Sequence, residues 1–355
     1  MKKTVGARVY NPSVNSFPQR PTLADVAAAA GVSRVTVSRV VEGSPQVSAT
    51  TRKRVEQAMD RLGYFGNAAA SQLVSGRART VGIVTSNVAD YGYACAIRGI
   101  EQRARLHDMA VLIVVIEGAE ADLVRKTVAT LAGHALAGVI AMDWDPTAHA
   151  VVPALPAYLP VVSTKPPVPG AVHHRPHVSI DERAGAHIAV DHLIKLGHRA
   201  IFVLGPPNDD PQDGRCWGAL DALTDARLPH YPVVRCADWS AGAGYAAACT
   251  MLDGWQDQIT AVSCANDQIA VGTVRAIFEH GLRVPEDISV VGFDNDPLAA
   301  FGRPSLTTMN QDFVQLGERA FDLLLDVIAG AAVIETPPEI PTLVVRESTA
   351  PPPRR

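Results

Sequence analysis

The sequence lacks the long apolar runs and targeting signals of a membrane or secreted protein. No apolar run in its 355 residues approaches the ~18–20 residues that a membrane-spanning helix needs. Lys2 and Lys3 stand near the start, but no apolar segment follows them, so no secretory signal is indicated. We therefore expect a cytoplasmic protein with no membrane partner.

Cysteine pairs and the sequence signatures of common active sites are also absent. The sequence contains no G-x-S-x-G, no Walker A loop and no G-x-G-x-x-G, so nothing nominates a nucleophile or a nucleotide site. His173, His174 and His177 lie in a proline-flanked loop without the fixed spacing of metal ligands. The scattered cysteines, odd in number and without C-x-x-C, predict reduced thiols: Cys95, Cys216, Cys236, Cys249 and Cys264. We expect neither an enzyme nor a cofactor.

Residues 22–62 carry the most informative pattern that is present. Thr22 can cap a first helix, Gly31 can adopt the positive φ of a tight turn, and Ser33 can cap a second helix. The apolar positions at helical spacing are Leu23, Val26, Ala27 and Ala30, then Val37, Val40 and Val41. Arg34, Val35, Ser38 and Arg39 are left outside. This pattern favours a helix-turn-helix that enters a major groove, and an ordinary αα-hairpin is the alternative.

The charge distribution favours DNA as a partner of this segment. Residues 1–80 contain 12 Lys and Arg against 4 Asp and Glu, a formal charge of +8. Residues 81–355 contain 20 against 32, a formal charge of −12. A basic module neutralises phosphates, whereas an acidic one is repelled by them. The opposite charges therefore predict a DNA-binding N-terminal part and a core with another task.

From residue 81, short apolar runs alternate with amphipathic stretches. The expected strands are Val81–Thr85, Val111–Ile116, Gly138–Met142, Val161–Thr164, Val178–Ile180, Ala200–Leu204, Ala261–Cys264 and Ile288–Phe293, with helices such as Glu182–Leu196 and Asp267–His280 between them. This rhythm is typical of parallel sheets made of βαβ units. The proline-rich stretch 153–169 breaks the series, so two α/β lobes are expected, with a ligand cleft at the strands' carboxyl ends.

Ordered motifs run from about residue 21 to about residue 348. They are T-L-A-D-V-A, A-G-V-S-x-x-T-V-S-R-V, V-S-x-x-T-R-x-x-V, L-G-Y, N-A-A-A-S-Q-L, L-I-K-L-G-H-R, A-N-D-Q, G-L-R-V-P-E-D-I-S-V-V-G-F-D and L-T-T. Together they resemble the lactose/galactose-repressor (LacI/GalR) family. The resemblance implies an all-α helix-turn-helix headpiece and an α/β two-lobed core, like that of periplasmic sugar-binding proteins.

The expected domain boundaries follow from the composition and this resemblance. They are a flexible extension at 1–20, the helix-turn-helix domain at 21–66, a hinge at 67–79, the core at 80–348 and a tail at 349–355. Within the core we expect a first lobe at 80–177 and 308–335, and a second lobe at 178–307 and 336–348.

The resemblance also assigns DNA contacts. Arg34, Val35 and Arg39 stand where the family contacts base edges, and arginine can bind guanine O6 and N7. Backbone phosphate contacts are expected from Thr22, Ser33, Thr36, Ser38, Thr50 and Arg52. The hinge would place Asn67, Ala70 and Leu73 at the minor groove, with Leu73 as an apolar wedge, and a passive linker is the alternative.

The expected effector site combines strand ends with the resemblance. In the second lobe Arg215 matches an arginine that binds sugar hydroxyls, and Asn266, Gln268 and Asp294 follow strand ends. Trp239 can stack on a sugar or belong to the core. The first lobe would contribute Ser86, Asp90 and Tyr93. Each polar residue can instead be a helix cap, and Asp267 is interpreted as one.

Lys165 departs from the family pattern, in which an aspartate usually faces the cleft. Lys165 either pairs with an anionic effector or turns to solvent, and we favour solvent.

These features predict a transcriptional regulator, most simply a repressor of carbohydrate-utilisation genes. It would bind a near-palindromic double-stranded operator as a homodimer, with higher assembly open, and respond to a small sugar-like effector. The alternatives are a carbohydrate-binding protein with a vestigial N-terminus and an enzyme acting on a sugar or nucleoside.

Overall fold

A computed structural model describes residues 21–41, 43–64, 78–167, 175–207, 214–332 and 336–354. The chain divides into two compact units, Met1–Ala78 and Arg79–Arg355. We describe the first, the headpiece, and the second, the core, separately. None of the described helices is long and apolar enough to cross a membrane.

The headpiece consists of α1 (Leu23–Ala30), α2 (Arg34–Val41) and α3 (Ala49–Leu62). Thr22 and Asp25 form the capping box of α1, and Gly31 has the left-handed φ of 63° that the turn requires. Ser33 accepts a hydrogen bond from the amide of Thr36 at the start of α2. Both predicted caps and the glycine turn are thus confirmed.

A small aliphatic core joins the three headpiece helices. Its buried side chains include Val26, Val37, Val40, Val55 and Ala58. The second helix is short and rich in β-branched residues, so it depends on this packing rather than on intrinsic propensity.

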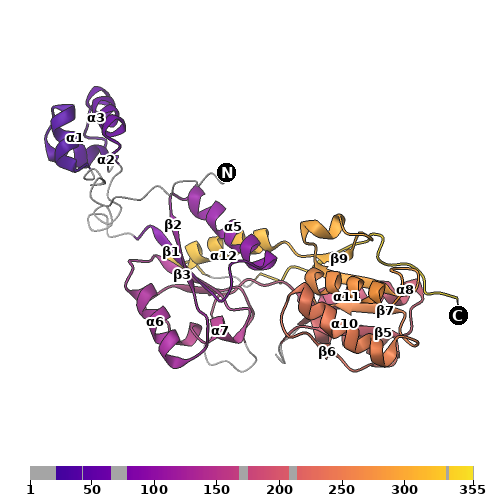
Figure 1. Ribbon diagram of the computed structural model, residues 1–355. Coiled ribbons are helices and arrows are strands. Elements are labelled where there is room, and N and C mark those ends of the chain that lie inside the picture. Colours follow the sequence, from indigo (N-terminus) through magenta and orange to yellow (C-terminus); the bar gives the residue numbers. More distant parts are fainter. Residues whose placement is uncertain are drawn as a thin grey trace, which may run out of the picture. The chain divides into compact units, whose positions relative to one another are not determined.

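The first lobe of the core contains a four-stranded parallel sheet with strand order β2-β1-β3-β4. Its strands are β1 (Thr80–Thr85), β2 (Ala110–Val115), β3 (Gly138–Met142) and β4 (Val161–Ser163). Helices α5 (Tyr91–Leu106) and α12 (Phe313–Ile328) cover one face, and α6 (Ala121–Ala132), α7 (Pro146–His149) and η1 (Val152–Ala154) lie with the other (Figure 1).

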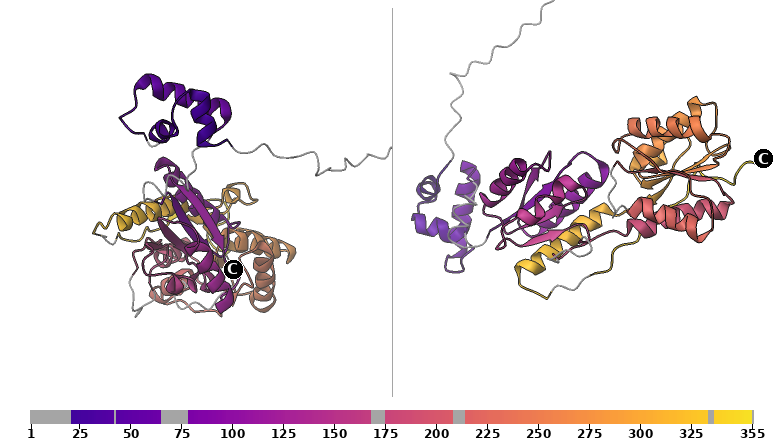
Figure 2. Two further views of the ribbon diagram at one scale, coloured as in Figure 1. Left: turned by 90° about the vertical axis from the view of Figure 1, so that its left-hand side faces the viewer. Right: turned by 90° about the horizontal axis from the view of Figure 1, so that it is seen from below.

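The second lobe contains a six-stranded sheet with strand order β10-β9-β8-β7-β5-β6. Its strands are β5 (Ile201–Gly205), β6 (Val234–Arg235), β7 (Ala261–Cys264), β8 (Ser289–Asp294), β9 (Thr307–Asn310) and β10 (Thr342–Val344). One helix layer is α8 (Glu182–Leu196) with α9 (Gly214–Asp225), and the other is α10 (Ala241–Trp255) with α11 (Asp267–Glu279). The sheet lies between these layers (Figure 2), and the 3-10 turn η2 (Pro297–Ala300) follows β8.

Most predicted strands are present, and the exceptions have local reasons. Residues 178–180 do not form a strand. Within them only Ile180 forms a β-bridge, an isolated one with Glu339. Three strands were missed: β6 has two residues, β9 (Thr307–Asn310) has little apolar character, and β10 follows a proline-rich segment. The second sheet is not wholly parallel, since β10 runs antiparallel to β9.

One predicted lobe boundary is wrong. The expected crossing at residues 307–308 would cut through β9. This strand pairs with β8 along its whole length, from Thr307 beside Val291 to Asn310 beside Asp294, so all of it belongs to the second sheet. The crossing therefore follows Asn310, before α12 returns to the first lobe.

Helix pairs in the core pack closely enough to require glycine. A Cβ atom at Gly99 of α5 would lie 2.1 Å from the carbonyl oxygen of Val314, and one at Gly317 of α12 would lie 2.1 Å from that of Ala96. The same close approach recurs at Gly244 and Gly272 between α10 and α11. These contacts leave no room for a side chain.

We expect Gly317→Ala to lower the free energy of unfolding of the full chain by at least ~1–3 kcal/mol, because overpacking forces backbone shifts. Chemical denaturation followed by circular dichroism measures this change. The matched control is Gly254→Ala in α10, where a Cβ atom meets nothing within 4 Å. That control should stabilise the protein by up to ~1 kcal/mol through helix propensity. Equal effects of the two substitutions would contradict the packing argument.

Candidate functional site

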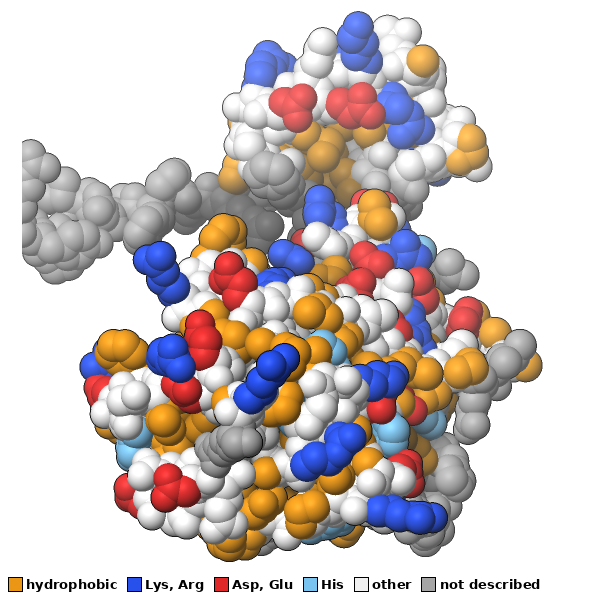
Figure 3. Space-filling view, turned by 90° about the vertical axis from the view of Figure 1, so that its right-hand side faces the viewer, with side chains coloured by type: hydrophobic (Ala, Val, Ile, Leu, Met, Phe, Trp, Pro, Cys, Tyr) orange, Lys and Arg blue, Asp and Glu red, His pale blue; other side chains and the backbone are white. Residues whose placement is uncertain are grey.

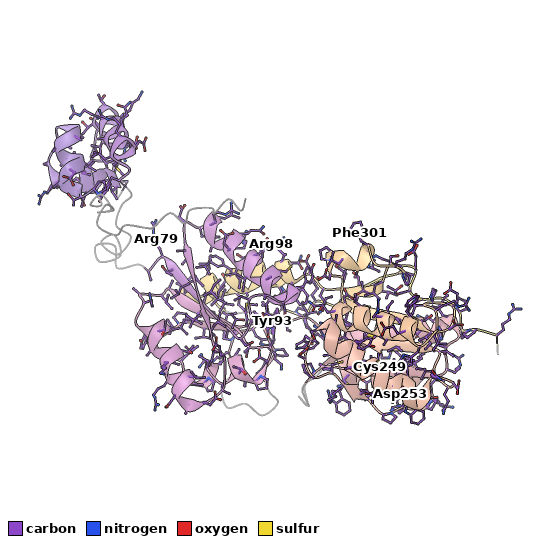
Figure 4. All side chains as sticks on the ribbon, viewed as in Figure 1. Arg79, Tyr93, Arg98, Cys249, Asp253 and Phe301 are labelled. Atoms are coloured by element: carbon purple, nitrogen blue, oxygen red, sulfur yellow. The ribbon has the colours of Figure 1, made fainter. Side chains whose placement is uncertain are left out.

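A cleft of about 540 Å³ lies between the two lobes of the core. Its walls follow the carboxyl ends of β1, β3, β4, β5, β7 and β8, as expected for parallel sheets. The predicted residues that line it are Asp90, Tyr93, Lys165, Arg215, Trp239, Asn266, Gln268 and Asp294. Tyr93, labelled in Figure 4, lies on the side of the first lobe that faces the second.

Arg215, in the first turn of α9, organises the second-lobe side of the cleft. Its Nε and Nη2 atoms donate to Glu182 Oε1 at 3.0 and 2.7 Å, and its Nη1 atom donates to the carbonyl of Ala265 at 2.6 Å. The guanidinium also forms an ion pair with Asp294 at 3.2 Å. Its side chain is only 11% exposed, so the hydrogen bonds of this fork are largely shielded from water.

Two aromatic rings lie close to the Arg215 guanidinium. The carbon atom at its centre lies 5.2 Å from the Trp239 ring and 4.8 Å from the Phe293 ring. Trp239 packs against the core of the second lobe and also lines the cleft, so its place in the core is confirmed and stacking on a sugar stays a prediction.

Asp294 stands at the end of β8 in a conformation that L-residues rarely adopt, with φ of 109°. Such strain is concentrated at functional sites. Burial raises the pKa of Asp294 to about 6, although the Arg215 guanidinium and the Gln311 amide favour the charged form.

Asp267 does not cap α11, contrary to the prediction. Asn266 is the N-cap and accepts from the Ile269 amide, and its own amide donates to the Trp239 carbonyl at 3.2 Å. The Asp267 carboxyl instead accepts from the Asp296 amide and the Thr308 hydroxyl. Burial, with the Asp294 carboxyl nearby, raises the pKa of Asp267 to about 8.

In the first lobe, Asp145 connects two of the predicted site residues, Ser86 and Tyr93, through hydrogen bonds. It accepts hydrogen bonds from the hydroxyls of Tyr93, at 2.9 Å, and Ser86. Its other carboxylate oxygen caps α7. Ser86 is not among the lining residues of the cleft, and its hydroxyl contacts Asp145 and Tyr93 instead.

An aromatic series forms the first-lobe wall. The Tyr93 and Trp144 rings are 4.5 Å apart, Trp144 and Phe313 are 5.7 Å apart, and Phe313 meets Tyr91 edge-on at 6.1 Å. Together with the polar groups of the second lobe, this wall suits a ligand with one apolar and one hydroxyl-bearing side.

Lys165 lies half-buried on the cleft wall, where its predicted place among the effector-site residues puts it, and the choice between an anionic partner and solvent stays a prediction. Asp90 lies on the same wall and accepts from the Asn87 amide at 2.7 Å. Burial and the Asp238 carboxylate of the second lobe raise the pKa of Asp90. His177 also lines the cleft, and the described residues contain no group of three that could hold a metal.

Sequence reasoning missed several lining residues: Tyr91, Trp144, Asp145, Glu182, Trp217 and Phe313. Trp144 and Asp145 follow β3, so the rule that nominated Asn266 and Asp294 would have found them. Helix α12 packs in the first lobe, as expected for residues 308–335, but no sequence pattern indicated that Phe313 would line the cleft.

The headpiece carries the predicted base-contacting residues on its surface. Arg34 and Arg39 are exposed, and Val35 is 60% exposed although it is apolar. Thr22 and Thr50 are exposed too. Ser33 and Thr36 hydrogen-bond to each other at 2.9 Å, and Ser38 is half-buried. Asn67, Ala70 and Leu73 lie outside the described residues.

Arg52, for which a phosphate contact is predicted, forms hydrogen bonds within the headpiece. Its Nη2 atom donates to the Ser44 carbonyl at 2.6 Å, and Nη1 donates to the Val40 carbonyl at 3.5 Å. The guanidinium therefore ties α3 to the end of α2 and is engaged within the headpiece.

Comparison with known proteins identifies this arrangement. A family model described as bacterial regulatory proteins, lacI family, matches residues 22–67, and one described as a periplasmic binding protein-like domain matches residues 190–349. The lactose operon repressor of Escherichia coli (strain K12) is 36% identical over 319 residues, which cover 88% of this chain and 86% of that protein. The chain belongs to the lacI family.

Further relatives support this assignment. The regulator CelR of Thermobifida fusca is 34% identical over 346 residues, covering 93% of this chain and 98% of that protein. The lac repressor dimer bound to operator and the anti-inducer ONPF has a TM-score of 0.82 at 33% identity, covering 94% of this chain and 100% of that one. This lacI-family chain is therefore a DNA-binding transcriptional regulator and not an enzyme.

The raised pKa of Asp294 makes a testable contribution to stability. The folded chain binds the proton of the Asp294 carboxyl more tightly than the unfolded chain does. Protonation of Asp294 therefore stabilises the fold fully below pH ~4, and this stabilisation is lost as the pH rises through about 6. We expect the free energy of unfolding of Asp294→Asn, relative to wild type, to increase by about 1–3 kcal/mol between pH 4 and pH 7.5. Urea denaturation at a series of pH values measures this difference.

Asp238→Asn is the matched control. Hydrogen bonds from Ser240 lower the pKa of Asp238, so its contribution is present at neutral pH and lost as the pH falls. The control should therefore show the opposite sign. A pH dependence of Asp294→Asn parallel to that of wild type would contradict the assignment.

Proposed function

We propose that this chain represses transcription by binding, as a homodimer, to a near-palindromic operator, and that a small neutral saccharide in the inter-lobe cleft relieves repression. The observation that carries the proposal is the cleft itself. It combines the Arg215, Asn266 and Asp294 hydrogen-bonding groups with an aromatic wall, on the same chain as an exposed helix-turn-helix. The DNA is in the cytoplasm, where we propose the protein acts.

The exposed side chains of α2 support base reading. Arg34 and Arg39 can each donate two hydrogen bonds to guanine, and Val35 offers an apolar contact to a thymine methyl. Residues 21–66 contain only 6 Lys and Arg, against 4 Asp and Glu. The remaining basic excess of residues 1–80 comes from the segments that flank the headpiece, so non-specific DNA affinity depends on those segments as well.

The charge of the cleft supports a neutral effector. Its acidic lining residues are Asp90, Asp145, Asp181, Glu182, Asp267, Asp294 and Asp296, and its basic ones are Lys165, Arg183 and Arg215. An anionic sugar would meet this acidic excess, whereas neutral hydroxyls can donate to carboxylates and accept from guanidinium groups. A related structure, the CelR–cellobiose complex, holds a neutral sugar.

An exposed apolar surface on the second lobe supports the homodimer. Phe278 on α11 is 71% exposed, Leu298 in η2 is 73% exposed and Phe301 just after η2 is 85% exposed. Phe301 projects from the second lobe in Figure 4. Elsewhere that lobe shows charged side chains of both signs between apolar ones (Figure 3). Two copies of a helix-turn-helix contact two half-sites, which is why a near-palindromic operator follows.

Selection from random-sequence DNA tests the whole proposal. Full-length protein should enrich an inverted repeat, and a neutral saccharide from a panel should release it from that repeat in an anisotropy titration. Enrichment without symmetry would overturn the dimeric mode. A selected operator that no saccharide releases or tightens would overturn the effector.

Arg39→Ala should reduce affinity for the selected operator by ~1–3 kcal/mol while changing affinity for random DNA little, because a base contact is lost. Anisotropy at fixed salt compares the two DNAs. The control Arg105→Ala removes an exposed arginine at the end of α5 in the core, and it should affect neither DNA. Equal loss on both DNAs would mean that Arg39 contacts phosphates rather than bases.

The effector's charge can be tested on the same protein. Wild type should bind the releasing sugar at least about tenfold more tightly than its uronate counterpart, because the cleft is acidic. In Lys165→Met the ratio of the two affinities should increase further, because the cleft then contains one positive charge fewer. Calorimetry measures both sugars, and Lys195→Met on α8, whose lysine pairs with Asp191, is the control. A uronate that wild type prefers and Lys165→Met rejects would show an anionic effector.

A further inference from the structure

Trp217 differs from the other tryptophans of the chain in its surroundings. Trp144 packs against Tyr93 and Phe313, Trp239 packs under Arg215, and Trp255 packs against Phe202 and Tyr231. Trp217 belongs to none of the hydrophobic clusters among the described residues, and it is 47% exposed. Tryptophan is enriched at contact surfaces, because its indole combines a large apolar area with a polar N–H group.

The indole of Trp217 lines the inter-lobe cleft. It lies two residues beyond Arg215 on α9, but Arg215 is 11% exposed, whereas Trp217 is about half exposed. The exposure increases from Arg215 to Trp217, which puts Arg215 among the inner polar groups and the indole at the rim of the cleft.

The backbone beneath Trp217 is held in place. The adjoining Gly218 lies so close to α8 that a Cβ atom there would be 2.0 Å from the Arg183 carbonyl oxygen. One turn further along α9, Asp221 accepts from Arg183 Nε at 2.6 Å. Trp217 therefore stands on a fixed part of α9, and a rigid aromatic surface loses little conformational freedom when a ligand covers it.

From this placement we infer that Trp217 is the platform of a second sugar subsite and that the effector is a disaccharide or a longer neutral saccharide. The first ring occupies the polar groups around Arg215, Asn266 and Asp294. The second ring lays its apolar C–H face on the Trp217 indole at the cleft rim. Arg183 lines the cleft beside this platform, and its guanidinium supplies hydrogen-bond donors for the hydroxyls of that ring.

This inference rests on the proposed sugar effector, and the experiment separates the two. Full-length protein is screened by thermal shift against cellobiose, maltose, lactose, trehalose, melibiose, sucrose, glucose, galactose and fructose. The disaccharide with the largest shift and its constituent monosaccharides are then titrated by calorimetry.

Wild type should bind that disaccharide about tenfold or more tightly than either monosaccharide. Trp217→Ala should lower the disaccharide affinity about three- to tenfold and leave the affinity for the inner-ring monosaccharide unchanged, because only the rim contact is removed. Trp217→Phe should retain most of the wild-type affinity for the disaccharide. Tyr158→Ala, which removes a 77% exposed aromatic ring that does not line the cleft, should change neither sugar.

The contrary outcomes are distinct. If monosaccharides bind as tightly as the disaccharide, or if Trp217→Ala weakens both sugars equally, the second subsite is wrong while the sugar effector stands. If no saccharide in the panel binds, the sugar effector and the second subsite both fail. Thermal melting of Trp217→Ala in the absence of sugar verifies that its fold is intact.

Discussion

The Arg215 guanidinium is the interaction on which the organisation of the cleft depends. It connects the start of α8 through Glu182, the end of β7 through the Ala265 carbonyl, and the end of β8 through Asp294. It also lies within about 5 Å of the Trp239 and Phe293 rings. The Asp294 side chain is only 13% exposed, so loss of the guanidinium would leave this carboxylate largely buried without its counter-charge, which costs ~3–5 kcal/mol. The arginine therefore shapes the site before any ligand arrives.

The carboxyls around this arginine explain why the site suits hydroxyl groups. Burial and the nearby Asp294 carboxylate raise the pKa of Asp267, and burial with the Asp238 carboxylate of the second lobe raises the pKa of Asp90 in the first. A neutral polyol can donate to these carboxyls without adding charge. Because the groups belong to both lobes, a ligand that satisfies them stabilises one arrangement of the lobes over another, which is the requirement for coupling to a distant site.

The headpiece achieves stability by different means. Its core consists of small aliphatic side chains, so the helix caps and the Arg52 bonds to the loop after α2 contribute a large share. Arg34, Val35 and Arg39 do not belong to the core of the headpiece. The surface proposed to contact DNA is thus separated from the contacts that hold the three helices together.

By itself the sequence determined the helix-turn-helix with its caps at Thr22 and Ser33, the α/β class of the core and most of its strands. These features are local, since capping, helical spacing and strand alternation act between residues close in the chain. Arg215, Asn266 and Asp294 were also identifiable, from motifs and strand ends.

Only the tertiary structure decided which residues meet across the cleft and which are engaged elsewhere. Phe313 lines the cleft because of the way α12 packs on the first sheet, and β9 joins the second sheet although its sequence is Thr-rich. Arg52 and Asp267 have partners that no spacing rule indicates, since those partners depend on how separate elements pack. The close approach of α9 to α8 at Gly218, between residues 35 apart in the chain, is likewise a tertiary contact that local sequence cannot specify.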